Sequence, residues 1–479
     1  MSLAARLSTH QSHQVLTDGR HTLTYAGLPQ EFARLDQLWH EAHHAHSGGA
    51  TILVGRNDLG SAVAGLYLLV KQRPCYFWRP TIEITGNTLP WTDLPEFCST
   101  AVLSHEPAPD AGTSSSVHDY ELALRPFSRQ PANMVLQPYT YLGTSGTTAR
   151  PKLAAYTPER MLGNAENCMR RFQLTVEDRV LLPLPIAHMY GLGAAFLPAV
   201  LAGASIYLLP QTNLLTYLQA ERCFDPTVVF LTPALANQLI AVRKQKRPYR
   251  LSVMGADRMN PETFARYEDQ HGCTVCVYGS TELGAVAASH PDDTYERRQH
   301  SSGRLMDQVR IVSVPRSTEP NDQATLAFDH PFAMAGYANA HGEPELPADV
   351  FRDGAYLTRD VGGLDELGDL RIYGRADDAV KRNGYLVAFS DVERALEQLP
   401  EIDRAVVISG EATSHGVGLV AFCVQNDATP IDETSIRKQL QTIIPSHAVP
   451  DRLVFLDQLP LTTTGKPDRQ ALRSLIGPA

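Results

Sequence analysis

The sequence has no excess of positive charge. Among its 479 residues, 42 lysines and arginines stand against 52 aspartates and glutamates, and the formal net charge is −10. Nucleic-acid-binding domains normally carry a basic surface, and no cluster of basic and aromatic residues interrupts this acidic balance. We therefore expect no nucleic-acid partner, although a local basic site for a polyphosphate is compatible with the composition.

Cysteine is scarce, with seven residues and no short repeating spacing. Secreted disulfide-rich domains need such a framework, so we expect a reducing compartment and a cytoplasmic protein. Cys273 and Cys276 form a C-x-x-C pair, but the residues around them have the pattern of a strand. Residues three apart on a strand point to opposite faces, so we interpret the pair as core packing and not as a metal or redox site.

Long apolar runs suited to a membrane are also missing, with one exception to examine. The first eight residues have no apolar core long enough for export. No charged residue occurs from Met189 to Pro210, a stretch long enough to span a bilayer. Pro198 and Gly203 interrupt it, and Ala204–Leu209 has the composition of a strand. We predict a buried helix followed by a buried parallel strand, and no membrane span.

What is present is the composition of a globular enzyme-sized chain, with 43% hydrophobic and 20% charged residues. Its length exceeds one ordinary core, so we predict at least two domains. Strand and helix patterns alternate up to Tyr278, which is typical of a doubly wound α/β fold. Residues 300–373 are β-rich and predict a smaller barrel-like lobe. The composition then shifts near Gly374, which predicts a large domain at 1–374, a junction at 375–377 and a compact α+β domain at 378–479.

The most informative stretch runs from Leu142 to Lys152. Glycines allow backbone N–H groups to approach a ligand, hydroxyl side chains add donors, and Lys152 adds a positive charge. This composition predicts a loop that binds the phosphates of ATP, although a polar surface turn between two strands also fits it. It is not a Walker loop, because the lysine follows proline. The candidate ATP-binding residues in this loop are Thr144, Ser145, Gly146, Thr147, Thr148 and Lys152.

Four further motifs follow in order, namely Val277–Glu282, Tyr356–Asp360, Tyr373–Gly384 and Thr463–Arg469. Together with the first loop they resemble the adenylate-forming superfamily of acyl-CoA synthetases, stand-alone adenylation domains and luciferases, over about residues 140–470. The resemblance implies ATP and Mg²⁺ as cofactors and a carboxylic acid as substrate. It implies an acyl-adenylate and pyrophosphate as first products, and then a thioester on CoA or on the phosphopantetheine of a carrier protein.

The resemblance also implies a role for each motif. Glu282 would hold Mg²⁺ and Thr281 would contact the α-phosphate, while Tyr278 would stack on adenine beside Gly279 and Ser280. Without the resemblance, Glu282 reads as a capping or solvated residue. Asp360 and Arg375 would bind the ribose, and otherwise read as a loop ion pair.

In the C-terminal domain the resemblance makes Lys466 the lysine that bridges the carboxylate and the α-phosphate, whereas a lone lysine is normally solvated. Asp377 would be the hinge about which this domain swings, and Lys381 and Gly384 would then line the channel for the thiol. Ala149, Leu153 and Arg359 stand where many relatives carry glycine, which affects loop mobility and local backbone geometry more than nucleotide binding.

Pro185–Gly191 resembles the segment that lines the acid pocket. Amino-acid-activating relatives have an aspartate where Met189 falls, which argues against an α-amino acid. The remaining pocket candidates are mostly small and would leave room for an aromatic or comparable hydrophobic acid. His188 is a catalytic candidate, with a structural histidine as the alternative. The pocket candidates are His188, Met189, Gly191, Gly255, Ala256 and Gly284.

Two other functions remain open from the sequence. One is a non-catalytic nucleotide-binding relative. The other is a zinc hydrolase, because His40-Glu41-Ala42-His43-His44 formally matches H-E-x-x-H. We disfavour zinc, since Ser47–Gly49 should end the helix within a turn and catalytic zinc needs three protein ligands. The sequence indicates no oligomeric state.

Overall fold

A computed structural model describes residues 2–10, 14–43, 49–78, 94–105, 121–126, 136–144, 152–312, 325–375, 378–382, 385–413, 416–426, 432–461 and 467–476. The chain forms two compact units. Unit 1 comprises Met1–Arg310, Asp329–Tyr356 and Glu366–Leu370. Unit 2 comprises Ile311–Phe328, Leu357–Asp365 and Arg371–Ala479. Its longest segment thus begins near the junction expected at 375–377, although residues 376–377 lie outside the described residues.

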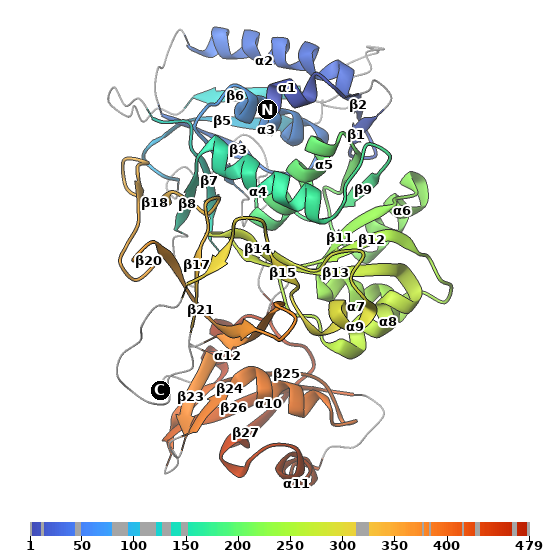
Figure 1. The fold of residues 1–479 in the computed structure, drawn as a ribbon, viewed down its shortest axis with the longest axis vertical. Helices are drawn as coiled ribbons and strands as arrows, with labels where there is room; N and C mark the ends of the chain where they lie inside the picture. The colour runs from blue at the N-terminus through green and yellow to red at the C-terminus, as the bar shows by residue number, and fades with distance from the viewer. Residues whose placement is uncertain are drawn as a thin grey trace. The chain divides into compact units, whose positions relative to one another are not determined.

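Two large sheets form the framework of unit 1 (Figure 1). The central strands of each sheet are parallel, and their order in the sheet differs from their order in the chain. The predicted doubly wound α/β fold is therefore confirmed. The nine-stranded sheet has the order β15 (Arg304–Leu305), β14 (Gly284–Ala288), β13 (Gly272–Ser280), β12 (Tyr249–Met254), β11 (Val228–Leu231), β9 (Arg179–Leu182), β10 (Ser205–Leu208), β1 (Val15–Thr17) and β2 (Thr22–Thr24). The eight-stranded sheet has the order β19 (Pro344–Glu345), β18 (Gly336–Ala338), β8 (Leu153–Tyr156), β7 (Thr140–Gly143), β4 (Cys75–Trp78), β3 (Ala50–Val54), β5 (Cys98–His105) and β6 (Glu121–Pro126).

The helices of unit 1 begin where the sequence supplies its own caps. Thr157, Thr232 and Asn260 each accept a hydrogen bond from the backbone three residues on, and each precedes a proline that is suited to the first helical turn. The helical elements are α1 (Leu3–Leu7), η1 (Tyr25–Gly27), α2 (Leu28–His43), α3 (Leu59–Val70), α4 (Pro158–Arg171), η3 (Tyr190–Phe196), α5 (Leu197–Ala202), α6 (Leu214–Phe224), α7 (Pro233–Val242), α8 (Pro261–His271) and α9 (Tyr295–His300).

The uncharged stretch after Met189 folds as predicted. It forms the buried elements η3 and α5, and then strand β10, which pairs in parallel with β9 and β1. Within the described ranges, every helix is too short or too polar to cross a bilayer.

The β-rich lobe forms a third sheet. Its strands follow the order β16 (Arg310–Ile311), β17 (Thr325–Asp329), β21 (Ala355–Leu364) and β20 (Phe351–Arg352), with β22 (Leu370–Arg375) also paired to β21. Over the residues that the structure describes, this strand path does not close on itself, so the lobe expected to be barrel-like is an open sheet.

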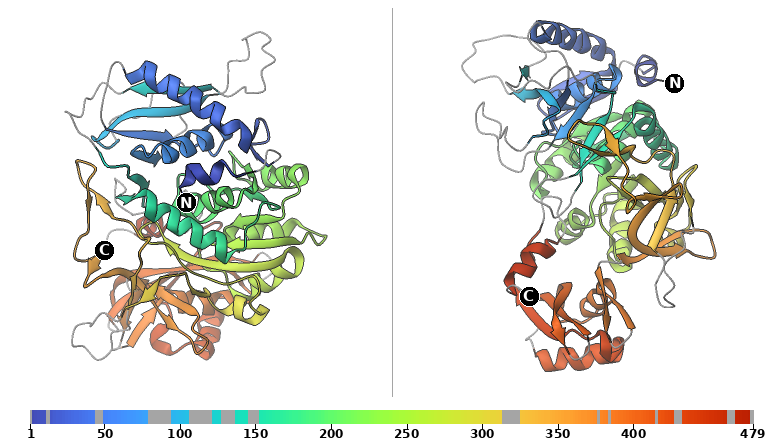
Figure 2. Two further views of the ribbon diagram at one scale, coloured as in Figure 1. Left: turned by 45° about the horizontal axis from the view of Figure 1, so that its top comes forward. Right: turned by 90° about the vertical axis from the view of Figure 1, so that its left-hand side faces the viewer.

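The C-terminal part of unit 2 is the α+β module predicted from the sequence (Figure 2). The two faces of its sheet have separate cores because successive residues of β25 point to opposite sides: Val407 packs with Leu396 and Leu440, whereas Val406 packs with Leu472. The sheet has the order β24 (Tyr385–Ala388), β23 (Ala379–Arg382), β26 (Gly416–Gln425) and β25 (Ile402–Thr413), with β27 (Arg452–Leu456) beside β26. The helical elements are α10 (Phe389–Glu397), α11 (Glu433–Ile443), η5 (Ser446–Ala448) and α12 (Arg469–Leu475).

The core beside the nine-stranded sheet contains a buried polar cluster. Glu221 accepts hydrogen bonds from Tyr249 and from Arg243, the latter at 2.5 Å. His271 is fully buried, and its ring centroid lies 4.3 Å from that of Tyr267 and 5.8 Å from that of Tyr249. Among the described residues, neither ring nitrogen of His271 has a hydrogen-bond partner. Burial, together with the charge of Arg243, lowers the pKa of His271 to about 4.

We expect the substitution His271→Phe to reduce the acid sensitivity of the fold. As the pH falls from 6.5 towards 4, the unfolded chain binds a proton at His271 that the folded chain does not, so stability is lost in this window. The lowered pKa corresponds to a loss of about 2–3 kcal/mol by pH 4.5. Phenylalanine keeps the ring stacking without the proton. Urea unfolding at pH 7 and pH 4.5 measures the difference, and an equal loss of stability in wild type and variant would contradict it.

Candidate functional site

The motif turn that contains Glu282 follows the carboxyl end of β13, at the edge where α/β sheets bind ligands. Ser280 Oγ accepts hydrogen bonds from the N–H groups of Glu282 and Leu283, both at 3.2 Å, and so holds the turn. Tyr278, Thr281 and Glu282 are half-buried, which leaves each partly accessible to a ligand.

A glycine is required immediately before this turn. A Cβ at Gly279 would lie 2.0 Å from the carbonyl oxygen of Gly284 on the paired strand β14. Gly279 therefore serves the close pairing of β13 with β14 in addition to any contact with a nucleotide.

The predicted phosphate loop connects β7 to β8, which pair in an antiparallel hairpin. The N–H of Thr144 donates to the carbonyl oxygen of Lys152 at 2.9 Å, so the two ends of the loop are fixed together. Ser145, Gly146, Thr147, Thr148 and Ala149 lie outside the described residues, and their contacts with phosphate stay predictions.

Tyr337 brings the phosphate loop and Glu282 to one place in unit 1. The Nζ of Lys152 lies 4.9 Å from the centroid of the Tyr337 ring. The hydroxyl of the same tyrosine donates to Oε1 of Glu282 at 3.0 Å. A lysine and a glutamate from two different sheets thus contact one side chain, and their charges suit a triphosphate and its metal ion respectively.

Hydrogen bonds also fix the backbone of the Glu282 turn. The hydroxyl of Tyr156 donates to the carbonyl oxygen of Thr281, and the N–H of Met334 donates to that of Glu282, both at 2.8 Å. Burial raises the pKa of Tyr156 well above its ordinary value, so its hydroxyl stays protonated and remains a donor. Arg160 in turn donates to the carbonyl oxygen of Met334 at 2.8 Å.

The donor set fits magnesium better than zinc. Mg²⁺ is usually held by one or two carboxylates, by substrate phosphates and by water, and Glu282 supplies such a carboxylate. In the part of the chain that the structure describes, no three His, Cys, Asp or Glu side chains lie close enough to hold a metal ion together. His40 is exposed on α2, and His44 lies outside the described residues, so the zinc alternative gains no support.

The segment expected to line the acid pocket is held by Asn57. The amide of this buried residue donates to the carbonyl oxygens of Leu182 and Leu209 at 3.2 and 3.0 Å, and its Oδ1 accepts from the N–H of Ile186 at 3.1 Å. His188 is half-buried and Met189 is buried. The π-helical element η3 follows directly, a geometry that is frequent at functional sites.

The small residues of this region have their own packing reasons. A Cβ at Gly191 would lie 2.1 Å from the carbonyl oxygen of Pro185, and one at Gly255 would lie 2.7 Å from the ring of Tyr190. The space beside both glycines is thus occupied, so their size does not measure room for a substrate. Ala256 is exposed with a φ of 70°, and such strain in a residue other than glycine is often found at functional sites.

Asn164 joins η3, which continues the segment Pro185–Gly191, to β14, which follows the Glu282 turn. Its Nδ2 donates to the carbonyl oxygen of Gly193 in η3, and its Oδ1 accepts from the N–H of Ala285 in β14, both at 2.8 Å. Gly284 makes room for this amide, because it has a φ of 69° and a Cβ there would lie 2.5 Å from Oδ1 of Asn164.

The remaining candidates belong to unit 2. Asp360 lies on β21, where its N–H donates to Oγ1 of Thr358 at 3.2 Å, and the exposed Arg375 ends β22. Lys381 lies on β23, paired with Leu386 of β24. Asp377, Gly384 and Lys466 lie outside the described residues. All of these assignments stay predictions.

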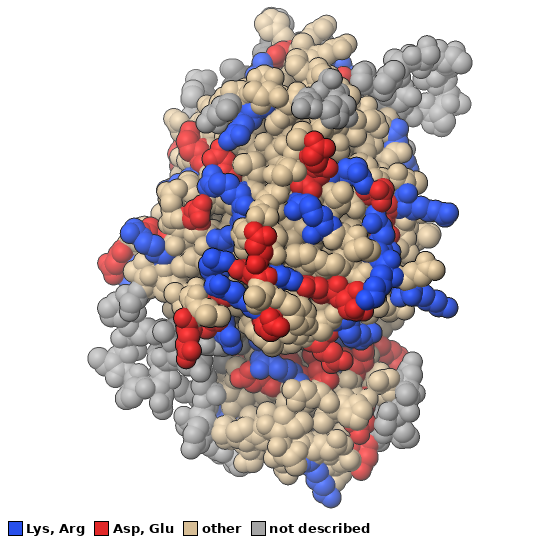
Figure 3. Space-filling model, turned by 45° about the vertical axis from the view of Figure 1, so that its right-hand side comes forward, with Lys and Arg blue, Asp and Glu red and all other residues tan. Residues whose placement is uncertain are grey.

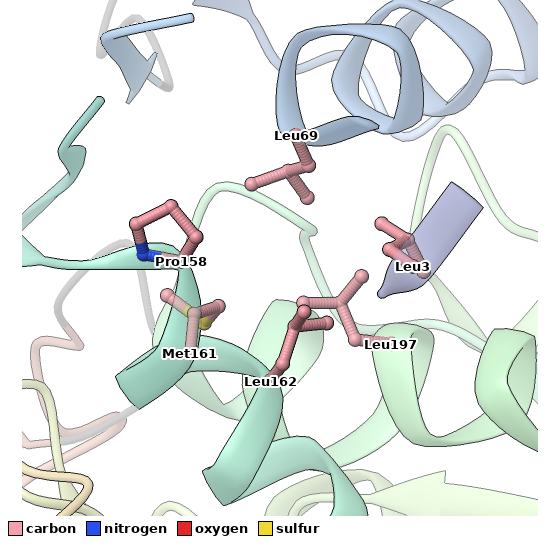
Figure 4. A pocket seen from close by; sticks show the side chains of 6 residues that line it. All are labelled: Leu3, Leu69, Pro158, Met161, Leu162 and Leu197. Carbon is pink, nitrogen blue, oxygen red and sulfur yellow. The ribbon is translucent and has the colours of Figure 1, made fainter. Parts of the chain in front are cut away.

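One apolar pocket of unit 1, shown in Figure 4, has none of the candidate site residues in its lining. Side chains from α1, α3, α4 and α5 point into it, and none of them carries a polar group that could bind phosphate. It is lined by Leu3, Leu69, Pro158, Met161, Leu162 and Leu197.

Residues 243–250 contain five lysines and arginines and Tyr249, so the sequence does hold one basic cluster, contrary to the expectation above. Lys246 pairs with Asp269 at 2.6 Å, and Arg247 pairs with Asp225 at 2.5 Å. Figure 3 shows acidic and basic side chains interleaved on one face of the molecule. Such local pairing reduces the net positive charge that this stretch presents to solvent.

The sequence reading missed Tyr156, Arg160, Asn164 and Tyr337. Only Arg160 left a signal. It lies in the first turn of α4, where the helix dipole disfavours a positive charge, so its presence there indicates a tertiary partner. The other three are ordinary residues until the strands are paired.

Comparison with known families matches most of the chain. The model of a family described as AMP-binding enzyme matches residues 87–338, which is more than half of the chain. A second model, described as AMP-binding enzyme C-terminal domain, matches residues 391–466.

Among curated proteins, the chain is 29% identical over 347 residues to an indoleacetate–CoA ligase of Aromatoleum aromaticum, covering 70% of this chain and 66% of that protein. It is 27% identical over 374 residues to a sulfoacetate–CoA ligase of Cupriavidus necator, covering 76% and 72%. The matches thus span about two thirds of the relatives' length. The solved structure of ATP-bound MatB from Rhodopseudomonas palustris matches with a TM-score of 0.80 and 21% identity, covering 99% of this chain and 98% of that one, which shows the fold.

We expect Gly284→Ala to destabilise unit 1 by about 3 kcal/mol, because a positive φ costs about 1–2 kcal/mol and overpacking against Asn164 adds a similar amount. Gly354→Ala is the matched control, since Gly354 has a φ of 81° and nothing within 4 Å of an added Cβ. This control should lose only the part of the stability that comes from the positive φ. Urea unfolding of both variants measures the difference. An equal loss of stability in the two variants would mean that Asn164 moves aside at no cost, which would contradict the prediction.

Proposed function

The chain belongs to the AMP-binding enzyme family, and from that premise we propose that it is an ATP-dependent acid–thiol ligase. In the first step the carboxylate of an acid attacks the α-phosphorus of ATP, giving an acyl-adenylate and pyrophosphate. In the second step a thiol of CoA or of a phosphopantetheinyl carrier protein takes the acyl group and releases AMP. The observation that carries the proposal is the shared contact of Lys152 and Glu282 with Tyr337.

The proposed roles in unit 1 follow from the chemistry of each side chain. Glu282 would hold Mg²⁺, and the bound ion would neutralise charge on the phosphoryl oxygens. Lys152 supplies a second positive charge for the triphosphate, and the hydroxyl of Thr281 is a donor for the α-phosphate. Tyr278 offers a half-buried aromatic face for adenine.

In unit 2 the proposed roles rest on the sequence motifs. Asp360 would accept hydrogen bonds from the ribose hydroxyls and Arg375 would contact the same ribose. Lys466 would neutralise charge between the acid and the α-phosphate. Asp377 would act as the hinge, and Lys381 with Gly384 would line the thiol channel in the second step.

For the acid we propose an aromatic or comparable hydrophobic molecule. Met189 is buried and apolar where an α-amino acid would need a carboxylate partner. The relative named as an indoleacetate ligase supports an aromatic acid, whereas the one named as a sulfoacetate ligase represents a small charged alternative. The reaction consumes ATP and a free thiol, and all seven cysteines of the chain are unpaired, so we propose the cytoplasm as its compartment.

The proposed function predicts ATP–pyrophosphate exchange that depends on an added acid. We expect aromatic acids such as indoleacetate to exceed sulfoacetate and α-amino acids by at least tenfold, which corresponds to about 1.4 kcal/mol of binding in the transition state. The active acids are then offered to CoA and to carrier proteins, and thioester is measured. ATP binding without exchange for any acid would favour a non-catalytic relative instead.

Replacing Lys466 by alanine should lower the exchange rate by at least 100-fold, because positioned charges at a developing phosphoryl charge contribute about 3 kcal/mol or more. Lys438→Ala is a suitable control, since Lys438 is an exposed lysine of α11 in the same unit. It should keep the wild-type rate. Exchange retained by the Lys466 variant would remove this residue from the first step.

A further inference from the structure

We propose that Tyr337 is a positioning residue that holds the Glu282 carboxylate and the Lys152 ammonium ready for a metal–triphosphate. The inference rests on the proposed function, because it concerns the same site. No family motif identified in the sequence contains Tyr337, and the argument comes from its contacts alone.

The two contacts of Tyr337 use different parts of the side chain. The hydroxyl donates to one oxygen of Glu282, at 3.0 Å from Oε1. This bond restricts rotation of the carboxylate and leaves its second oxygen for a cation. Carboxylates that bind metals are commonly held by such an outer hydrogen bond, and its loss typically weakens metal binding. The ring face attracts the ammonium of Lys152, whose Nζ lies 4.9 Å from the centroid.

This arrangement keeps two opposite charges in one site without joining them. Among the residues that the structure describes, Lys152 and Glu282 are not joined in an ion pair. A direct pair would have to break before phosphate could reach the lysine and a cation could reach the glutamate. With the tyrosine as partner of both, each charge is oriented by a weaker contact that the ligand can replace.

The backbone of Tyr337 is itself held on both sides. Strand β18 pairs with β8, with Tyr337 opposite Ala154, and with β19, with Tyr337 opposite Glu345. The N–H of Ala335 donates to the carbonyl oxygen of Ala155 at 2.7 Å. A Cβ at Gly336 would lie 2.6 Å from the carbonyl oxygen of Glu345, so the strands approach closely here.

The Arg160 guanidinium fixes the segment that enters this strand. It donates to the carbonyl oxygens of Ala333 and Met334 at 2.7 and 2.8 Å, and to the hydroxyl of Tyr356 at 2.9 Å. Met334 also donates its N–H to the carbonyl oxygen of Glu282. The backbone before Tyr337 is therefore hydrogen-bonded directly to the backbone of its carboxylate partner. The ring is therefore positioned before any ligand arrives.

The test is calorimetric titration of ATP into the full chain, with Mg²⁺ and with EDTA. Tyr337→Phe keeps the ring and removes the hydroxyl. We expect it to lower the gain in ATP affinity caused by Mg²⁺ by about tenfold and to leave the affinity in EDTA unchanged. Tyr337→Leu also removes the ring, and we expect the affinity in EDTA to fall as well.

Tyr25→Phe is the matched control, because it removes a buried tyrosine hydroxyl bound to the carbonyl oxygen of Ala204, remote from Glu282 in the sheet order. It should keep the wild-type gain from Mg²⁺, whatever its melting temperature. A wild-type gain in Tyr337→Phe, or an equal loss of affinity in Mg²⁺ and in EDTA, would overturn the role of Tyr337 alone. Wild-type protein that binds no ATP in either solution would overturn the proposed function, and this inference with it.

Discussion

The site of unit 1 depends on one constraint, which is that its two large sheets must keep a fixed position relative to each other. The phosphate loop leaves the eight-stranded sheet between β7 and β8, whereas Glu282 follows β13 of the nine-stranded sheet. Tyr156 of β8 donates to the carbonyl oxygen of Thr281, and Met334 donates to that of Glu282. Each such bond is worth only about 1 kcal/mol net, but a buried carbonyl left without a donor costs about 1–3 kcal/mol. Slipping one sheet against the other would break several bonds at once, so the relative position of Lys152 and Glu282 is well determined.

The elements that could be predicted from the sequence are those with local signals. Helices α7 and α8 have such signals at their first residues, because Thr232–Pro233 and Asn260–Pro261 are caps that need no tertiary partner. Helix α6 has a weaker local signal at its start. Its cap pairs Asn213 with Thr216, and threonine at this position is a weaker signal than the glutamate or glutamine of the usual capping box. The barrel-like lobe proved an open sheet, since strand composition alone does not determine which strands meet.

The same distinction separates the predicted from the unpredicted site residues. Glu282 and Lys152 lie in short motifs whose chemistry can be read within ten residues. Tyr337 is an ordinary strand residue until β18 is paired with β8, and only then does its side chain reach both of them, Glu282 through the hydroxyl and Lys152 through the ring. The glycines predicted to line the acid pocket show the reverse case, because their small size is visible in the sequence and the packing that requires it is not. Gly255 makes room for the ring of Tyr190, so what seemed open space is filled from a distant part of the sequence.

These contacts also explain why the acid segment and the Glu282 turn cannot be treated as independent. Adenylation requires the acid carboxylate to reach the α-phosphorus at about 3–3.5 Å, and small errors in that approach are costly in rate. Asn164 is bonded to Gly193 of η3 and to Ala285 of β14, and it is 1% exposed. Asn164 can make both bonds because Gly284 has a positive φ and no side chain in the space that the amide occupies. The proposed mechanism therefore needs Asn164 for alignment even though this residue has no charge, no proton to transfer and no expected contact with the phosphates.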